Sequence, residues 1–387
     1  MKPKLAIVIG FLVAVALIVW FATRKKDDQP HDGKSTVVAA KPAATVEISL
    51  EYSTEKKDWI ETVVKDFEGS HPSIKVALIG KGSLEAESAI YDGTDKPTLW
   101  SPADSSIANL LASEWQTKYG KPPYPQPEPL LLTPLVFAVW EDRAKVLLDA
   151  SGGQLSWKAI HKAVASPKGW PAIGGKPTWG FVKLGQTDPN RSNSGVQALE
   201  LMAMEFFGTQ ALTPEQMLDT KFQDFVKETE SGVQKFEAST GTFMTDMVRF
   251  GPSKYDIAVV YESLAVSQLE NAQGRWGSLH IYYPPTTIWS DHPIAILDAP
   301  WVTAEQKAAA KTLVEFLRSP RVQGWALRFG FRPADPSVPL KTNDELNPFK
   351  KSAAYGLSLE LPPAANAPDG AVVRQLLMMW SRVVKRS

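Results

Sequence analysis

The sequence of 387 residues has no cysteine, few histidines and no excess of charge of either sign. The lack of cysteine excludes disulfide bridges, cysteine-based zinc sites and a lipid-modified N-terminal cysteine. None of the histidines has the HExxH spacing of a zinc site, and they are His31, His71, His161, His280 and His292. We predict that His292, in an Asp-His-Pro turn, makes a structural hydrogen bond rather than binding a metal. The 42 basic and 42 acidic residues balance, which argues against a nucleic-acid partner, because such proteins carry a basic face.

Two common catalytic or phosphate-binding motifs are also missing. The sequence contains no GxSxG elbow, so a serine hydrolase has no support. Residues 174–178 (GGKPT) resemble part of a phosphate loop, but the leading glycine is missing and Pro177 cannot donate a backbone N–H. We therefore predict no enzymatic activity, no cofactor and no metal site.

One long apolar run lies at the N-terminus, residues 5–22 (LAIVIGFLVAVALIVWFA), between lysines at 2 and 4 and the RKK of 24–26. It reaches the lower end of a membrane span and exceeds the roughly 7–15 residues of a signal-peptide core. We predict that residues 1–26 are an uncleaved membrane anchor and that the polar residues 27–44 are a linker. Basic residues on both sides leave the orientation of the anchor open.

Three consecutive segments show the pattern of a strand, a hydroxyl-bearing turn and a helix. Residues 45–52 (TVEISLEY) alternate apolar and polar side chains, and the next two units begin with strands at 74–80 (IKVALIG) and 98–100 (TLW). The repetition predicts a parallel α/β sheet, in which ligands bind at the carboxyl ends of the strands. The alternative is that each hydroxyl only caps a helix. The candidate ligand-binding residues at this edge are Ser53, Thr54, Ser83 and Ser101.

The stretch TDPNRSNSG at residues 187–195 lies between a β-rich run and a helical pattern. Ser194 and Gln197 fit a capping box that starts this helix. One cap needs only one such residue, and the free N–H groups at a helix start attract anions. We predict an anion-binding loop; the alternative is an ordinary polar loop. The candidate ligand-binding residues here are Thr187, Asp188, Arg191, Ser192, Asn193 and Ser194.

Further strands are predicted along the rest of the chain. Residues 130–140 (LLLTPLVFAVW) form a β-prone run that Pro134 is expected to break, and residues 279–297 predict two short strands around a proline-rich bend. Residues 255–269 (YDIAVVYESLAVSQL) predict an apolar core strand followed by a helix. Tyr261 and Glu262 lie at the end of that strand, again where ligands bind, and complete the candidate set.

This order of features resembles the type II periplasmic solute-binding proteins, the receptors of ABC importers, and most closely their molybdate-like branch. The matching segments are 187–195 (TDPNRSNSG), 255–263 (YDIAVVYES), 291–293 (DHP) and 305–334 (EQKAAAKTLVEFLRSPRVQGWALRFGFRPA). The resemblance implies a bilobal α/β fold, with two mixed sheets flanked by helices and a ligand held in the cleft between them. It implies a first lobe of residues 45–133 and 285–387 and a second lobe of residues 134–284. It also implies that the bulk of the chain lies on the extracytoplasmic side of the membrane.

Two carboxylates in the predicted cleft leave several interpretations open. Asp188 and Glu262 would repel a bare oxyanion unless one of them is protonated. In some relatives of the molybdate/tungstate branch, carboxylates coordinate the metal of the oxyanion, and the resemblance implies a similar placement for these two. The alternatives are that Asp188 caps its own turn, that Glu262 pairs with Arg191, or that the ligand carries a cationic group.

These features together predict a membrane-anchored, extracytoplasmic protein that clamps a small anionic ligand and delivers it to an ABC permease. The alternative is a membrane-tethered sensor or adaptor that uses the same cleft. A metal-assisted hydrolase built on Asp188 and Glu262 is less favoured, because the sequence offers no evident general base.

Overall fold

The computed structural model describes residues 45–362 and 364–384. The predicted membrane anchor and linker, residues 1–26 and 27–44, lie outside the described residues. Within the described residues, no helix combines the length and the apolar character that a membrane crossing needs.

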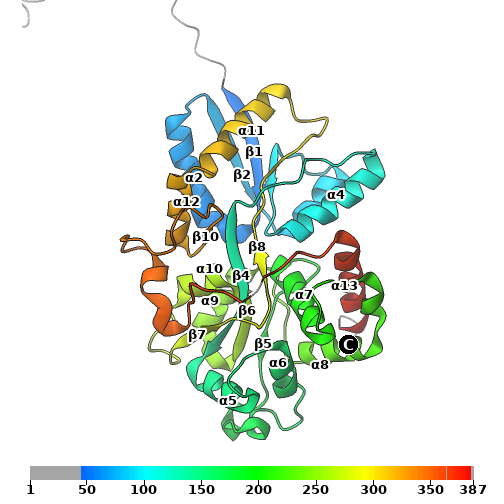
Figure 1. Cartoon of the computed structure of the whole chain (residues 1–387), viewed down its shortest axis with the longest axis vertical. Helices are drawn as coiled ribbons and strands as arrows, with labels where there is room; N and C mark the ends of the chain where they lie inside the picture. The colour runs from blue at the N-terminus through cyan, green and yellow to red at the C-terminus, as the bar shows by residue number, and fades with distance from the viewer. Residues whose placement is uncertain (1–44, 363, 385–387) are drawn as a thin grey trace, which may run out of the picture. The chain divides into compact units, whose positions relative to one another are not determined.

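The described strands form two mixed sheets, and the first has the order β2-β1-β3-β9. β1 runs parallel to both β2 and β3, as the three predicted strand–helix units require, and β9 is antiparallel to β3. These strands are β1 (Val46–Tyr52), β2 (Ile74–Gly80), β3 (Leu99–Ser101) and β9 (Ala295–Ile296). The helices packed around them are η1 (Thr54–Lys56), α2 (Lys57–Ser70), α3 (Ser83–Asp92), α4 (Ser105–Tyr119), α11 (Ala304–Leu317) and α12 (Pro320–Ala326). We call this sheet and these helices the first lobe (Figure 1).

Periodic apolar positions explain these elements. In β1, Ile48 and Leu50 are buried at alternate positions, while Val46 at the strand's start stays half-buried. The helix α2 buries Trp59, Val63 and Phe67 along one face. It packs with α11 and α12 on one side of the sheet, and α3 and α4 cover the other side.

The second sheet has the order β11-β8-β4-β6-β5, and β7 and β10 also pair with β4. Its strands are β4 (Leu131–Trp140), β5 (Leu184–Gly185), β6 (Ile257–Tyr261), β7 (Leu279–Tyr282), β8 (Thr287–Ser290), β10 (Arg332–Pro333) and β11 (Ala364–Ala365). Its α-helices are α5 (Glu141–Ser151), α6 (Trp157–Val164), α7 (Asn193–Phe207), α8 (Thr220–Glu230), α9 (Thr240–Phe250), α10 (Glu262–Gln268) and α13 (Gly370–Val383). We call this sheet and these helices the second lobe (Figure 1).

Short 3-10 helices connect several of these elements. They are η2 (Trp170–Ile173), η3 (Pro177–Trp179), η4 (Pro214–Leu218), η5 (Gly251–Ser253), η6 (Leu327–Phe329), η7 (Pro348–Lys350) and η8 (Ser352–Tyr355).

The strand β4 runs without a break through Pro134, contrary to our prediction. Thr133 and Pro134 pair with β8, whereas pairing with β6 starts only at Leu135. Pro134 therefore lies where a partner strand changes, a position at which its missing N–H is tolerated. The residues at the start of β4 pack in the first lobe, and Phe137 packs in the second, so β4 crosses from one core to the other.

The chain returns to the first lobe within the segment of residues 279–297. Ile288 of β8 packs in the second lobe and Ile294 in the first. The C-terminal helix α13 contacts α4 of the first lobe, and it also contacts η4, α7 and α8 on the second. The helix α13, which we count with the second lobe, thus also packs on the first, and the predicted division at residues 133/134 and 284/285 remains a prediction.

Candidate functional site

The candidate hydroxyls of the first lobe gather at the carboxyl edge of its sheet. Ser53 directly follows β1, Ser101 is the last residue of β3, and both are buried. Ser83 starts α3 and accepts a hydrogen bond from the backbone N–H of Ala103 at 3.0 Å. Thr54 lies on η1 with an exposed side chain. The parallel strands thus bring Ser53, Ser83 and Ser101 together, because their carboxyl ends meet at one edge.

A buried lysine binds this edge together. The Lys56 Nζ donates to the Ser53 Oγ at 2.5 Å, to the Ser101 carbonyl at 2.8 Å and to the Pro102 carbonyl at 3.1 Å. Burial lowers the pKa of Lys56 to about 7. Sequence reasoning missed Lys56, because a lysine in a charged run before a helix is normally solvated.

On the second lobe, the loop before α7 forms a cluster of hydroxyls. The Oγ of Ser194 lies 2.7 Å from the Oγ1 of Thr187 and 2.7 Å from the Oγ1 of Thr240, and the Oγ of Ser192 lies 3.2 Å from Thr240. The two starting turns of α7 and α9 therefore meet here. Thr240 was not among the predicted residues, although the Ser-Thr pair before an apolar run is the same kind of helix-start signal.

The predicted capping box at Ser194 and Gln197 is wrong. The N-cap of α7 is Ser192, whose side chain makes no capping hydrogen bond within the described part of the chain. The Gln197 side chain instead reaches across to the first lobe, where its Nε2 donates to Asp104 Oδ2 at 2.6 Å. Gln197 therefore bonds to Asp104, in a distant segment, instead of to the backbone at the start of its own helix.

Asp104 joins the two lobes. Its Oδ2 accepts from Gln197 and, at 2.7 Å, from the Asn193 Nδ2, which also donates to the Tyr261 hydroxyl at 3.0 Å. Its Oδ1 caps α4 by accepting from the Ser106 N–H and the Ile107 N–H. Burial raises the pKa of Asp104, and these donors act in the opposite direction. The Asp-Ser-Ser sequence signalled the start of α4, but nothing local indicated the bridge.

His292 lies between the hydroxyl edge of the first lobe and Tyr261. Its Nδ1 is 3.3 Å from the Lys56 Nζ and 3.5 Å from Glu55 Oε1, and its ring centroid is 6.3 Å from that of Tyr261. Its backbone N–H donates to the Ala103 carbonyl at 3.0 Å. Burial and the nearby Lys56 charge lower the pKa of His292 well below its ordinary value.

Three of the predicted ligand-binding residues, Glu262, Arg191 and Asp188, are paired with another residue, exposed, or bonded within their own turn. The buried Glu262 carboxylate accepts two hydrogen bonds from Arg332, at 2.8 and 2.7 Å, so it pairs with Arg332 rather than with Arg191. Arg191 is exposed. Asp188 accepts from the Asn190 N–H at 2.9 Å, as a residue that caps its own turn does. Whether any candidate residue binds a ligand remains a prediction.

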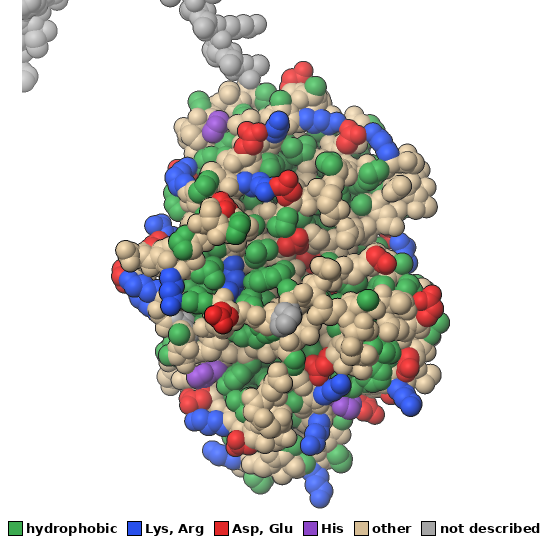
Figure 2. Space-filling view, viewed as in Figure 1, with side chains coloured by type: hydrophobic (Ala, Val, Ile, Leu, Met, Phe, Trp, Pro, Cys, Tyr) green, Lys and Arg blue, Asp and Glu red, His purple; other side chains and the backbone are tan. Residues whose placement is uncertain are grey.

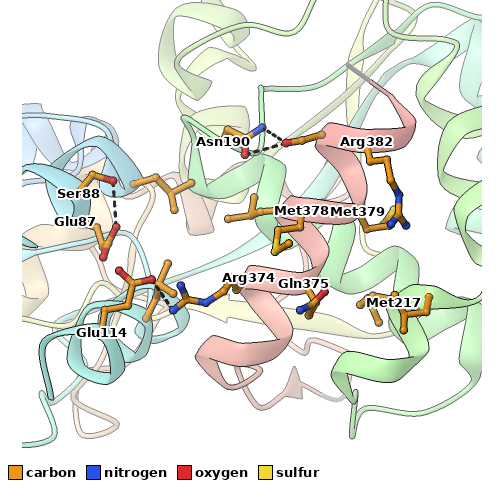
Figure 3. A pocket seen from close by; sticks show the side chains of 15 residues that line it. Glu87, Ser88, Glu114, Asn190, Met217, Arg374, Gln375, Met378, Met379 and Arg382 are labelled. Atoms are coloured by element: carbon orange, nitrogen blue, oxygen red, sulfur yellow. Dashed lines mark hydrogen bonds and ion pairs between the residues drawn. The ribbon is translucent and has the colours of Figure 1, made fainter. Parts of the chain in front are cut away.

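Other features of the described chain bear on the site. No group of three or more His, Asp or Glu residues among the described ones is arranged to hold a metal ion. Figure 2 shows acidic and basic side chains interspersed over the face drawn. A pocket of about 600 Å³, lined by Asn190 but by none of the clustered hydroxyls, lies between α3 and α4 on one side and α13 and η4 on the other (Figure 3). In it, Arg374 pairs with Glu114 at 2.6 Å and joins the same two lobes.

Comparisons with known proteins identify the fold and the family. The family model described as "Bacterial extracellular solute-binding protein" matches residues 48–332. No curated protein matches the chain.

Solved structures cover nearly all of the described residues. The sulfate-binding protein SubI from Mycobacterium tuberculosis H37Rv is 17% identical, with 82% of this chain and 94% of that chain covered and a TM-score of 0.53. The periplasmic binding protein AfuA from Actinobacillus pleuropneumoniae is 15% identical (88% and 99% covered, TM-score 0.58). A ferric binding protein from Campylobacter jejuni is 12% identical (87% and 99% covered, TM-score 0.59).

At this identity the likeness to solved structures shows the fold alone, and it confirms the predicted bilobal type II periplasmic-binding fold with two mixed sheets. The match to the family model covers most of the chain. The chain therefore belongs to the bacterial extracellular solute-binding protein family, and it is a solute-binding protein rather than an enzyme.

Proposed function

We propose that this protein clamps a small anion between its two lobes and delivers it to an ABC-type permease. Two sets of buried hydroxyls, one in each lobe, carry the proposal: Lys56 bonds to the first set, and Asn193 and Gln197 beside the second set bond to Asp104 of the first lobe. Ser53, Ser101 and Lys56 come from the first lobe, and Ser192 and Ser194 come from the second. Hydroxyl and ammonium donors are the groups that bind oxyanions in proteins.

The starts of three helices support this proposal. Among the described residues, the N-caps of α3, α7 and α9 (Gly82, Ser192 and Ser239) make no side-chain capping bond. The first N–H groups of these helices are therefore not satisfied by a cap, and a helix start carries a partial positive charge. Such a site favours an anion.

The names of similar structures are consistent with an anion. One protein of the same fold is named as sulfate-binding, and another has fructose-6-phosphate bound. Others are named as ferric binding proteins, so the fold alone does not select the ligand. Membership of the molybdate-like branch, delivery of the ligand to an ABC permease and ligand binding by the candidate residues of the loop at 187–195 remain proposals.

A thermal-shift screen tests the anion. Molybdate, tungstate, sulfate, phosphate and small organic anions are compared with sugars, amines and divalent cations. A ligand at a hundredfold excess over its Kd should stabilise the fold by about 2.7 kcal/mol. Ser194→Ala should weaken the binding of the anion found by roughly 1.5–3 kcal/mol, as loss of a hydrogen bond to a charged group does.

Ser267→Ala is the matched control, because Ser267 is exposed on α10 and bonds only the backbone of its own helix in the described contacts. It should leave anion binding unchanged. A melting temperature that responds to sugars, amines or divalent cations but to no anion would refute the proposal.

We also propose that residues 5–22 hold the mature protein in the cell membrane, with residues 45–387 on the extracytoplasmic side. Carbonate washing of membranes should fail to release the protein, and detergent should release it, because the apolar run is long enough to span. The control is a chain shortened to residues 45–387, which should appear in the soluble fraction. A soluble mature form that starts after residue 22 would instead show that the run is a cleaved signal peptide.

A further inference from the structure

Four buried polar atoms, on residues linked by contacts through His292, lack a hydrogen-bond partner in the described part of the chain: Ser101 Oγ, His292 Nε2, Glu55 Oε1 and Asn193 Oδ1. Their residues belong to one chain of contacts. The Lys56 Nζ touches both the Ser101 carbonyl and the His292 ring, and the His292 ring touches Glu55. Asn193 joins through Tyr261, whose ring faces that of His292. Unpaired polar atoms are rare in protein interiors, and a group of them requires an explanation, such as bound water, an ion or a ligand.

Some of these atoms are donors. In the tautomer protonated on Nε2, the His292 ring donates from that atom, and its Nδ1 lies 3.3 Å from the Lys56 Nζ and 3.5 Å from Glu55 Oε1. The Ser53 Oγ accepts from Lys56, which leaves its hydroxyl hydrogen for another partner. Together with the Ser101 hydroxyl, these groups can donate to the oxygens of an anion.

Two of the atoms can only accept. The Nδ2 of Asn193 donates to Asp104 Oδ2 at 2.7 Å, which fixes the amide and leaves its Oδ1 as an acceptor. The Oε1 of Glu55 is a carboxylate oxygen on a side chain that is only 8% exposed. A fully ionised oxyanion such as sulfate or molybdate has no hydrogen to offer these acceptors and is repelled by the carboxylate. A buried acceptor left unpaired destabilises the complex.

We infer that the ligand is a phosphate compound that also donates hydrogen bonds: inorganic phosphate in a protonated form, or a phosphate monoester with a hydroxylated organic group. This inference rests on the proposed function, since it assumes that the cluster between the lobes holds an anion. The donors of the cluster bind the phosphate oxygens, and Glu55 and Asn193 accept from the hydroxyl hydrogens of the ligand.

Isothermal titration calorimetry on the full chain in detergent at pH 6 tests this inference, with inorganic phosphate, fructose 6-phosphate, sulfate and molybdate as probes. Phosphate or fructose 6-phosphate should bind at least roughly tenfold more tightly than sulfate and molybdate, because the latter leave a charged acceptor unpaired. Whichever of the two phosphate probes binds more tightly shows whether the ligand is inorganic phosphate or a phosphate monoester.

Glu55→Gln places an amide, which can donate, where the carboxylate now lies. The ratio of phosphate affinity to sulfate affinity should fall by about tenfold, mostly through tighter sulfate binding. Glu61→Gln, at an exposed position of α2, is the matched control and should leave the ratio unchanged. The melting temperature of each variant without ligand checks that it folds.

The outcomes separate the two proposals. Sulfate or molybdate binding as tightly as both phosphate probes would overturn the inference and leave the proposed function standing. An unchanged ratio in Glu55→Gln would also overturn it. Binding of none of the four anions would overturn the inference alone, and the tungstate and small organic anions of the thermal-shift screen would then test the proposed function.

Discussion

At the scale of single residues, Gly195 shows how the loop of residues 187–195 is held against α7. A Cβ atom at this position would lie 2.6 Å from the Thr187 carbonyl and 2.8 Å from the Pro189 nitrogen. Both are backbone atoms, so the neighbours cannot move aside as a flexible side chain would. The glycine is needed for space, and it lets the hydroxyls of Thr187 and Ser194 approach each other.

Gly195→Ala should therefore destabilise the protein by about 1–3 kcal/mol, the usual range for overpacking. Gly324→Ala is the control, because Gly324 lies inside α12 with open space around its Cβ position. That change should stabilise by roughly 0.5–1 kcal/mol, since alanine loses less backbone entropy than glycine in a helix. Chemical denaturation of both variants measures the difference. Equal stabilities for the two would contradict the close approach.

At the scale of elements, Asp104 both starts α4 and binds α7. Its capping bonds are those of an ordinary N-cap, and Asp369 makes the same two bonds at the start of α13. Asp104 differs from Asp369 because it is fully buried and because it accepts hydrogen bonds from the side-chain amides of Asn193 and Gln197 in the other lobe. The comparison of these two caps isolates the contribution of the bridge between lobes.

Asp369→Ala should reduce the free energy of unfolding by about 1 kcal/mol, as loss of a cap does. Asp104→Ala should reduce it by a further 1–3 kcal/mol or so for each amide donor left buried without a partner. Denaturant titrations of the two variants give the comparison. Similar losses in both would mean that the amides find other partners and that the bridge contributes nothing.

At the scale of the whole molecule, buried carboxyl groups set the pH dependence of stability. Burial raises the pKa of Glu51 and of Glu87 to about 7, and that of Glu230 to about 8. Glu51 and Glu87 lie in the first lobe and Glu230 in the second. The folded state therefore binds more protons than the unfolded state between pH 4.5 and these values, so its stability falls as the pH rises through this window.

The melting temperature should accordingly be higher at pH 5 than at pH 7. His292 acts in the opposite sense, because its lowered pKa favours folding as the pH rises through about 6.5, but burial also raises the pKa of Asp104, Glu200 and Asp291, so it is one group against six. The triple variant Glu51→Gln, Glu87→Gln, Glu230→Gln should show a smaller difference, because Asp104, Glu200 and Asp291 still contribute, whereas Glu61→Gln should keep the full difference. A wild-type protein that melts at the same or a higher temperature at pH 7 would show that the sign is wrong.

Features that repeat over a short stretch of sequence could be predicted, whereas contacts between distant segments could not. The alternation in β1 and the apolar face of α2 predict a strand and a helix, because a repeat of two or of 3.6 residues is visible within a dozen neighbours. The three successive strand–helix units predicted a parallel sheet, and the paired strands β1, β2 and β3 confirm it. The edge of that sheet was predictable for the same reason.

The partners of the polar side chains were not predictable. Lys56 and His292 are 236 positions apart, and Asp104 and Gln197 are 93 apart. Local patterns treat a lysine as solvated and a Ser-x-x-Gln sequence as a cap, and here both expectations fail. Arg332 pairs with Glu262 from 70 positions away, and no local pattern favoured it over Arg191.

The sequence by itself thus determined the strands, the helices, the family resemblance and the edge where polar residues gather. These follow from short-range periodicity and from the preferences of residues at helix starts. Only the tertiary structure decided which of those polar residues are buried and what each one contacts. Burial and pairing arise when segments far apart in the chain meet, and a pattern confined to neighbouring residues carries no information about which distant segment supplies the partner.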